Sequence, residues 1–248
     1  MSSTTADAGR PPLRFRPRRW PTLATLVGVA ILIALGTWQL QRLAWKEGLI
    51  AAREAALSAT PVPLPSESED WRAWEFRRVS VTGVFDHDAE QLFGLQALGG
   101  RPGHHVLTPL VRENGPAVLI DRGWVPLDRA HPLARGEGQV PGQVTITGIA
   151  RYRADDRPGW LTPANEPDER IWYGYDLDAL ETATDLALLP VVVEADATAN
   201  PGGLPVGGQT RIELPNRHLQ YVVTWYGLAL TLIGVYLAFS LERKPPYR

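Results

Sequence analysis

Two long apolar runs lie near opposite ends of the chain. The second, from Leu219 to Leu241, holds 23 residues without a charge. At 1.5 Å per residue, a helix of that length crosses a hydrocarbon core of about 30 Å. The run also has small residues suited to helix contacts in lipid, and aromatic residues suited to the membrane interface: Gly227, Ala229 and Gly234, then Tyr221, Trp225, Tyr226 and Tyr236. We therefore predict a transmembrane helix at 218–241 rather than a buried helix of a soluble protein.

The first run is shorter, with 17 uncharged residues from Thr22 to Trp38. A basic segment precedes it, as in a secretory signal peptide. The Ala34–Gly36 segment is a poor cleavage site, however, and the helical pattern continues through it, with Gln39 and Gln41 able to extend the span into the interface. An uncleaved transmembrane helix at 21–41 is the prediction, and a cleaved signal peptide is the alternative.

The charges beside these two runs orient the protein. Residues 1–20 carry five Arg and one Asp, and residues 242–248 carry three Lys or Arg and one Glu. Basic flanks stay in the cytoplasm under the positive-inside rule. We therefore expect a hairpin in the cell inner (plasma) membrane, with 1–20 and 242–248 cytoplasmic and the main domain periplasmic.

The segment between the runs predicts a β-rich domain. Residues 42–70 read as a helical extension to about Leu57 followed by a Pro/Ser linker, and 71–217 as the extracytoplasmic domain. Short β-branched stretches separated by turn residues predict strands, at 77–85, 90–98, 104–111, 116–125, 142–152, 171–176, 189–195 and 211–214, with one short helix at 177–186. The expected fold class is a membrane protein of α+β type, in which two transmembrane helices flank an antiparallel β-rich domain.

Composition excludes several chemistries. The chain has no cysteine, so disulfides, thiolate nucleophiles and covalent haem attachment through a C-x-x-C-H motif are excluded. The net charge of −2 argues against nucleic acid as a partner. No hydrolase, zinc-protease, nucleotide-binding or dinucleotide-binding motif is found, and we expect no enzyme. One alternative is a catalytic carboxylate pair among the charges of a Pro/Gly-rich loop, which otherwise read as solvated: Asp155, Asp156, Glu166, Asp168 and Glu169.

Two further motifs have structural interpretations. The sequence from Asp121 to Trp124 reads as a turn that closes a strand, although Asp121 and Arg122 could also form a site. The adjacent His104 and His105 would point to opposite faces of a strand, which is a poor geometry for one metal ion.

His218 stands directly before the second apolar run, at the outer membrane surface in the predicted topology. A neutral imidazole there could ligate haem iron, with Arg217 and Arg42 pairing with the propionates. Alternatively, His218 only begins a helix and the arginines contact lipid phosphates. Trp38 and Arg42 share one helical face. An aromatic belt at the membrane interface, followed by cationic side chains that snorkel toward water, also explains this pattern.

An ordered set of motifs resembles the Surfeit locus protein 1 family of cytochrome c oxidase assembly factors. It consists of "GTWQLQRLAWK", "EFRRVSVTGVF", "PGHHVLTPL", "VLIDRGWVP" and "LPNRHLQYVVTWYGLA", in family order. The chain departs from the family pattern at Asp121, where Asn is usual, and at His104, where an aromatic residue is frequent. We expect no functional role for His104.

The resemblance implies a bacterial assembly factor that binds haem a and aids its insertion into cytochrome c oxidase subunit I. It implies that His218 is the axial ligand of the haem iron. Arg217, Arg42, Trp38 and Tyr221 are additional candidates for cofactor contact, and haem a synthase is a candidate partner. The alternative function is a structural membrane chaperone that holds apo-oxidase subunit I without binding haem.

Overall fold

The computed structural model describes residues 13–156, 159–160, 162–210 and 217–243. The chain folds as two compact units. One is helical and comprises Met1–Ala51 with Leu214–Arg248, and the other is β-rich and comprises Ala52–Glu213. The predicted strand at 211–214 lies outside the described residues.

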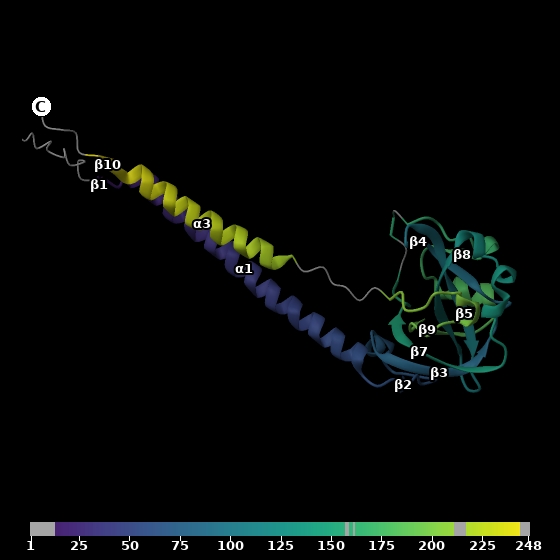
Figure 1. The fold of residues 1–248 in the computed structure, drawn as a ribbon. Coiled ribbons are helices and arrows are strands. Elements are labelled where there is room, and N and C mark those ends of the chain that lie inside the picture. The colour runs from purple at the N-terminus through teal and green to yellow at the C-terminus, as the bar shows by residue number, and fades with distance from the viewer. Residues whose placement is uncertain (1–12, 157–158, 161, 211–216, 244–248) are drawn as a thin grey trace, which may run out of the picture. The chain divides into compact units, whose positions relative to one another are not determined.

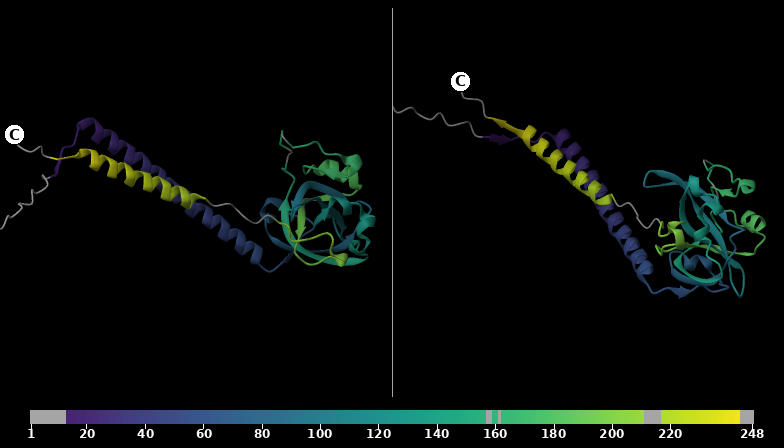
Figure 2. Two further views of the ribbon diagram at one scale, coloured as in Figure 1. Left: turned by 45° about the horizontal axis from the view of Figure 1, so that its top comes forward. Right: turned by 45° about the vertical axis from the view of Figure 1, so that its right-hand side comes forward.

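The helical unit is built on α1 (Arg19–Ser58) and α3 (His218–Ser240). Both helices are long and apolar enough to cross a membrane. They lie side by side in Figures 1 and 2, and β1 (Leu13–Phe15) pairs with β10 (Leu241–Arg243) in an antiparallel two-stranded sheet. Helix α1 continues past the predicted span, as expected from the helix-forming residues up to about Leu57.

Hydrogen bonds and close packing join the two helices. Thr22 Oγ1 lies 2.7 Å from the Tyr236 hydroxyl, and Thr37 Oγ1 lies 3.1 Å from the Tyr226 hydroxyl. Gly36 lets the Tyr226 ring approach so closely that a Cβ at position 36 would stand 3.0 Å from it. Small residues and hydroxyl hydrogen bonds are the usual means of helix association in lipid.

The small residues that make these contacts are partly different from those predicted. Ala229 of α3 is buried, but a Cβ added at Gly227 or Gly234 would meet no atom of the described residues within 4 Å. The close approaches instead occur at Gly36 and Gly28 of α1. The prediction that Gly227 and Gly234 serve helix packing was therefore wrong for the described structure. The small residues at the contact are on α1, and α3 contributes large side chains that pack against them.

The β-rich unit contains a mixed sheet whose order is β2-β3-β7-β9-β6-β5-β4-β8. An additional pairing of β3 with β5 closes β3, β7, β9, β6 and β5 into a barrel. Figure 2 shows this unit from two sides. The strands are β2 (Val62–Pro63), β3 (Arg78–Phe85), β4 (Gln91–Leu98), β5 (Arg101–Val111), β6 (Ala117–Pro126), β7 (Gln143–Tyr152), β8 (Ile171–Trp172) and β9 (Leu188–Ala195). The described helices of this unit are α2 (Leu177–Thr184) and five 3₁₀ turns at Trp71–Trp74, Leu127–Arg129, Pro132–Gly138, Pro167–Glu169 and Pro201–Gly203.

The prediction of an antiparallel domain is correct for most strand pairs but not for all of them. The β2–β3, β4–β8 and β6–β9 pairs are parallel, and the other described pairs of this sheet are antiparallel. Parallel neighbours need a crossover connection, and the segment from β6 to β9 supplies one that includes β7 and α2. Strand β8 is also shorter than the predicted 171–176, because the chain leaves the sheet after Trp172 and enters α2.

Alternation along the strands creates two apolar layers. The first draws buried residues from all five barrel strands and fills the interior, with Val81, Leu110, Ile120, Ala150 and Val193 among them. The second lies on the outer face, where Leu119 and Val192 pack with Trp172 and Leu180. Because successive side chains point to opposite faces, the residues that follow Leu119 and Val192 by two positions continue this outer face. They are Asp121 and Glu194.

Strand β6 runs without interruption through the segment that was predicted to be a turn. The residues from Asp121 to Trp124 all belong to the strand, and Trp124 also bridges to Val206. Gly123 has a φ of 114°, and a Cβ there would collide with the Val206 carbonyl group. The glycine is thus required by close backbone approach within a sheet, not by a chain reversal.

Candidate functional site

Helix α3 begins at His218, with Arg217 as its N-cap residue. His218 Nδ1 lies 2.7 Å from Oε1 of Gln39 on α1. Because an amide oxygen only accepts, Nδ1–H is the donor in this bond, which places the lone pair of a neutral imidazole on Nε2. A hydrogen bond of this kind is how proteins fix the tautomer and ring orientation of metal-ligating histidines.

Gln39 is the residue of this site that sequence reasoning missed. It was interpreted only as an extension of the span into the interface, but it is 9% exposed. An amide among apolar residues in a membrane span indicates an internal partner, since an unsatisfied polar group in lipid is costly. The sequence thus indicated that Gln39 has a partner, but it did not indicate that the partner is His218.

The other predicted contact residues are arranged around the two helices in different ways. Arg42 lies over the ring of Trp45 on its own helix, 4.8 Å from the ring centroid. Trp38 and Tyr221 are each 51% exposed. The structure therefore joins His218 to Gln39, leaves two aromatic side chains accessible, and gives the Arg42 guanidinium an aromatic neighbour.

Trp225 adds an unusual buried group to the same helix. It follows His218 by seven residues, two helical turns later and so on the same face. Its indole Nε1 is buried and has no hydrogen-bond partner among the described residues. Buried N–H groups without a partner are rare in folded proteins, so this one marks Trp225 as a candidate contact residue.

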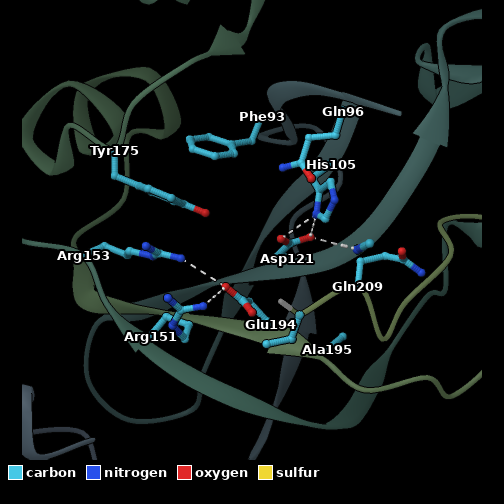
Figure 3. A pocket seen from close by; sticks show the side chains of 12 residues that line it. Phe93, Gln96, His105, Asp121, Arg151, Arg153, Tyr175, Glu194, Ala195 and Gln209 are labelled. Carbon is cyan, nitrogen blue, oxygen red and sulfur yellow. Dashed lines mark hydrogen bonds and ion pairs between the residues drawn. The ribbon is translucent and has the colours of Figure 1, made fainter. Parts of the chain in front are cut away.

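A second polar site lies on the outer face of the barrel. It is a cavity of about 240 Å³ whose lining includes His105, Asp121, Arg153, Tyr175 and Glu194. Figure 3 shows these side chains converging from separate strands and from the segment before α2. None of them belongs to the haem site predicted from the sequence, although Asp121 was weighed as part of a possible site with Arg122.

His105 and Asp121 form a buried ion pair at this cavity. His105 Nδ1 lies 2.8 Å from Asp121 Oδ2, and the two side chains are 9% and 10% exposed. Burial by itself lowers the pKa of His105. The hydrogen bond and charge of Asp121, together with the charge of Glu194, outweigh burial and raise that pKa above its ordinary value.

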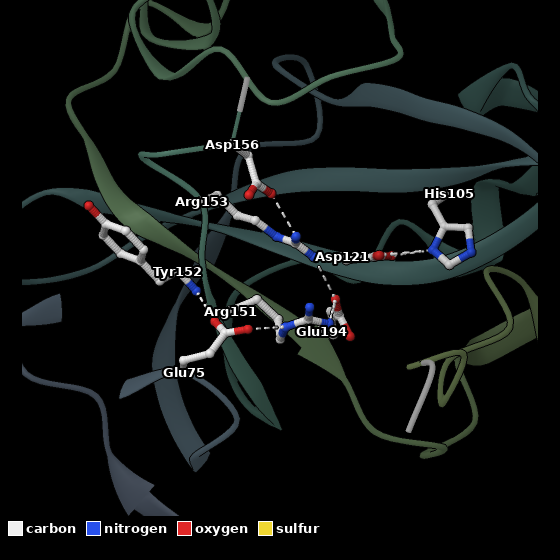
Figure 4. A network of polar contacts seen from close by, with 8 residues as sticks. All are labelled: Glu75, His105, Asp121, Arg151, Tyr152, Arg153, Asp156 and Glu194. Atoms are coloured by element: carbon white, nitrogen blue, oxygen red, sulfur yellow. Dashed lines mark hydrogen bonds and ion pairs between the residues drawn. The ribbon is translucent and has the colours of Figure 1, made fainter. Parts of the chain in front are cut away.

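Glu194 binds two arginines on the other side of the cavity (Figure 4). Its Oε1 accepts from Arg151 at 2.9 Å and from Arg153 at 3.1 Å. Arg151 also donates to Glu75 at 3.0 Å, and Arg153 donates to Asp156 at 2.7 Å. The network thus runs along the sheet as a continuous series of alternating charges.

The sheet register explains why these partners are needed. Asp121 on β6 and Glu194 on β9 are direct cross-strand neighbours. Like charges in that relation are destabilising. His105 on one side and the two arginines on the other offset the repulsion. The alternative of a catalytic carboxylate pair in the acidic loop meets a different arrangement in the structure. Asp155 forms an ion pair with Arg72 at the surface, and Asp156 forms one with Arg153.

The remaining histidines have separate contacts. His104 Nδ1 meets the Gly94 carbonyl group, His87 Nε2 lies 3.0 Å from the Val140 carbonyl oxygen, and His131 caps a 3₁₀ turn. Across the described residues, no group of three or more His, Asp or Glu side chains is placed to hold a metal ion.

Comparison with known proteins identifies the family. The sequence model of the SURF1 family matches residues 26–230. The chain belongs to the SURF1 family. It is 36% identical to Surfeit locus protein 1 of Rattus norvegicus over 233 residues, which cover 87% of this chain and 74% of the rat protein. For Surfeit locus protein 1 of Homo sapiens the identity is 37% over 227 residues, covering 85% and 74%.

A SURF1-like protein of Monosiga brevicollis is 37% identical over 237 residues, covering 91% of this chain and 87% of that protein. The region matched by the family model, residues 26–230, includes most of α1, residues 218–230 of α3 and the whole barrel. Membership of the SURF1 family supports a role in cytochrome c oxidase assembly.

Proposed function

We propose that this protein is a haem a chaperone, which binds haem a through His218 and delivers it to subunit I of cytochrome c oxidase. The family supports the assembly role. The observation that carries the haem proposal is the hydrogen bond from His218 to Gln39, because it orients an imidazole at the start of a membrane helix with its lone pair on Nε2.

The residues near the helix start suit a haem as cargo. A flat apolar ring fits beside exposed aromatic side chains such as Trp38 and Tyr221. Arg217 and Arg42 supply cations for the propionates, and the amino end of α3 favours a negative charge. The Trp225 indole N–H, which is buried without an acceptor among the residues that the structure describes, is available to a polar group of the cargo.

A single axial histidine suits a carrier better than a closed pair would. A chaperone has to release its cargo to the apo-oxidase, and two strong axial ligands would retain the iron. Gln39 then acts as a positioning residue, which sets the direction of the His218 ring without contacting iron.

We place the protein in the cell inner membrane, with both ends cytoplasmic and the barrel periplasmic. The two apolar helices support a membrane location, and the basic flanks support the orientation. In this arrangement His218 lies at the outer surface, where it can meet subunit I, and haem a synthase is a candidate donor of the haem. We infer a non-enzymatic role.

The alternative is a structural chaperone that holds apo-subunit I without binding haem. The two functions differ in the oxidase that accumulates in a His218→Ala strain. A haem chaperone predicts that subunit I reaches the membrane in normal amounts but is short of haem a. A structural chaperone predicts no change in the haem a to subunit I ratio.

That ratio is measured on membranes by pyridine haemochrome spectra and immunoblotting. His131→Ala is the matched control, since His131 is an exposed histidine of the barrel unit. A normal haem a to subunit I ratio in His218→Ala, with oxidase activity equal to the control, contradicts the haem proposal.

A further inference from the structure

A cavity of about 330 Å³ lies between α1 and α3, at the end of the helical unit that carries the β1–β10 sheet (Figure 1). Leu232 and Ser240 both line it, and they are about 12 Å apart along α3. The helices touch at Leu232, which a Cβ at Gly28 would approach to 2.9 Å. At Ser240, the carbonyl oxygen accepts from the Arg16 backbone N–H at 2.8 Å. Contacts between the two chain ends thus close a groove at both of its ends.

One wall of this groove is an apolar stripe on α3. Four lining residues have the i, i+3, i+4, i+7 spacing of a single helix face: Leu232, Val235, Tyr236 and Phe239. Tyr236 contributes mainly its ring, because its hydroxyl is already 2.7 Å from Thr22 Oγ1. Phe239 is 85% exposed and Val235 is 46% exposed. The stripe therefore offers contact area to an apolar occupant that runs along the helix.

The charged residues of the groove are both cations. Arg16 and Arg18 line it, and the described lining residues include no carboxylate. A guanidinium has five N–H donors, so an arginine that is bonded to one group can still donate to a phosphate. The wider sequence points the same way, since residues 1–20 and 242–248 together hold eight Lys or Arg and two Asp or Glu. An anion is therefore favoured at this end of the groove.

We propose that this cavity binds an anionic glycerophospholipid, with its phosphate at Arg16 and Arg18 and one acyl chain along the α3 stripe. Basic pockets between transmembrane helices are suited to anionic head groups. A free phosphate would pair with the arginines but leave the stripe uncovered. A zwitterionic lipid would cover the stripe but bring a second cation toward the arginines.

The lipid site rests on the membrane location proposed above, in which this end of the helices is cytoplasmic. It is separate from the haem site, because His218 begins α3 whereas the groove lies along the last turns of that helix. A lipid held there would contact α1 and α3 at once. It would therefore stabilise the pairing of the two helices at the cytoplasmic face.

The test uses the full chain in detergent micelles and dioleoylphosphatidylglycerol as the probe. Dioleoylphosphatidylcholine, which has the same acyl chains and no net charge, is the matched lipid. Native mass spectrometry counts the lipids bound at each concentration. We predict one saturable site that binds the anionic lipid about tenfold or more tightly, because each nearby cation adds to its affinity. Equal binding of the two lipids, or binding that does not saturate, overturns the proposal and leaves only general solvation of the helices by lipid.

Charge variants separate a defined site from diffuse attraction. Arg16→Gln and Arg18→Gln should each weaken binding of the anionic lipid about fivefold and leave binding of the zwitterionic lipid unchanged. Arg19→Gln removes the same charge at an exposed position that is not among the described lining residues, so its effect should be much smaller. An equal loss in all three variants contradicts the site.

The acyl chain has its own test. Val235→Trp fills the groove without changing its charge and should weaken binding of the anionic lipid about tenfold or more. Leu237→Trp, at an exposed position of α3 outside the described lining, should leave it unchanged. Soluble glycerol 3-phosphate should fail to displace the lipid, because it lacks the chain. Displacement by glycerol 3-phosphate, or equal binding in the two tryptophan variants, contradicts a lipid site.

Membrane fractionation of cells that make the full chain distinguishes failure of this site from failure of the membrane location. Protein recovered in membranes that shows no preference for the anionic lipid refutes the lipid site alone. Protein recovered in the soluble fraction refutes the membrane location and the lipid site with it.

Discussion

At the scale of single residues, the buried pair of His105 and Asp121 makes the stability of the fold depend on pH. The pKa of His105 is raised from its ordinary value of 6.5. A raised pKa in the folded state means that folding favours the protonated ring. This stabilisation is fully present below pH 6.5 and is lost as pH rises through the folded-state pKa.

We therefore predict that the free energy of unfolding of the full chain in detergent falls as pH rises above 6.5, and that His105→Gln reduces this fall. Urea unfolding followed by tryptophan fluorescence at a series of pH values measures it. His131→Gln, at an exposed histidine, should keep the wild-type pH dependence. Identical slopes for wild type and His105→Gln contradict the assignment.

Gln39 gives a second prediction at the residue scale. Gln39→Leu keeps the apolar character of the span but removes the acceptor of the His218 Nδ1–H. Loss of such an orienting group typically lowers affinity about 10–100-fold. Titration with haem should show weaker binding and a changed visible spectrum. Gln41→Leu, at an exposed position two residues later, is the control. An unchanged affinity and spectrum in Gln39→Leu contradicts the positioning role.

Residue-scale prediction from the sequence had clear limits. His218 stood out because it directly precedes a charge-free run, which local sequence shows. Its partner Gln39 is 179 positions away, and only the pairing of the helices brings them together. The same holds for Asp121 and Glu194. They are neighbours because β6 and β9 pair in parallel, and no local sequence pattern encodes that pairing.

At the scale of elements, one of the close contacts between α1 and α3 sets the small residue Gly36 against the large Tyr226 side chain. A Cβ at Gly36 would stand 3.0 Å from the Tyr226 ring, so Gly36→Val should separate the helices there. Gly227→Val is the matched control, because a Cβ at that position meets no atom within 4 Å in the part of the chain that the structure describes.

The chain has no cysteine, so a Gly28→Cys, Leu232→Cys pair can be cross-linked in membranes with a short bifunctional maleimide. We predict efficient cross-linking in this background and in the Gly227→Val form, with a clear loss in the Gly36→Val form. Equal cross-linking in all three would show that the helices are not held by this contact.

Most of the strands were predictable as elements, whereas their arrangement was not. The stretches expected at 77–85, 142–152 and 189–195 match β3, β7 and β9 within one residue, because alternating β-branched residues between turn signals identify strands well. Closure of the barrel by β3 and β5 involves only two residue pairs. So short a contact leaves no separate pattern in the sequence.

At the scale of the whole molecule, the proposed function requires both ends of the chain on one side of the membrane. Reporter fusions at residue 130 and at the C-terminus should report opposite sides, with the C-terminus cytoplasmic. The reason is that basic residues precede the first apolar helix and follow the second. Signals from the same side would rule out the hairpin and with it the location proposed for His218.

The haem content of the purified protein tests haem binding through His218 without any intermediate step. Wild type, His218→Ala and His131→Ala are isolated as full chains from cells that make haem a, and the visible spectrum and haem-to-protein ratio of each are recorded. We predict bound haem a in wild type and His131→Ala, and little or none in His218→Ala. A wild-type protein without haem, or a His218→Ala protein with unchanged haem content and spectrum, would contradict it.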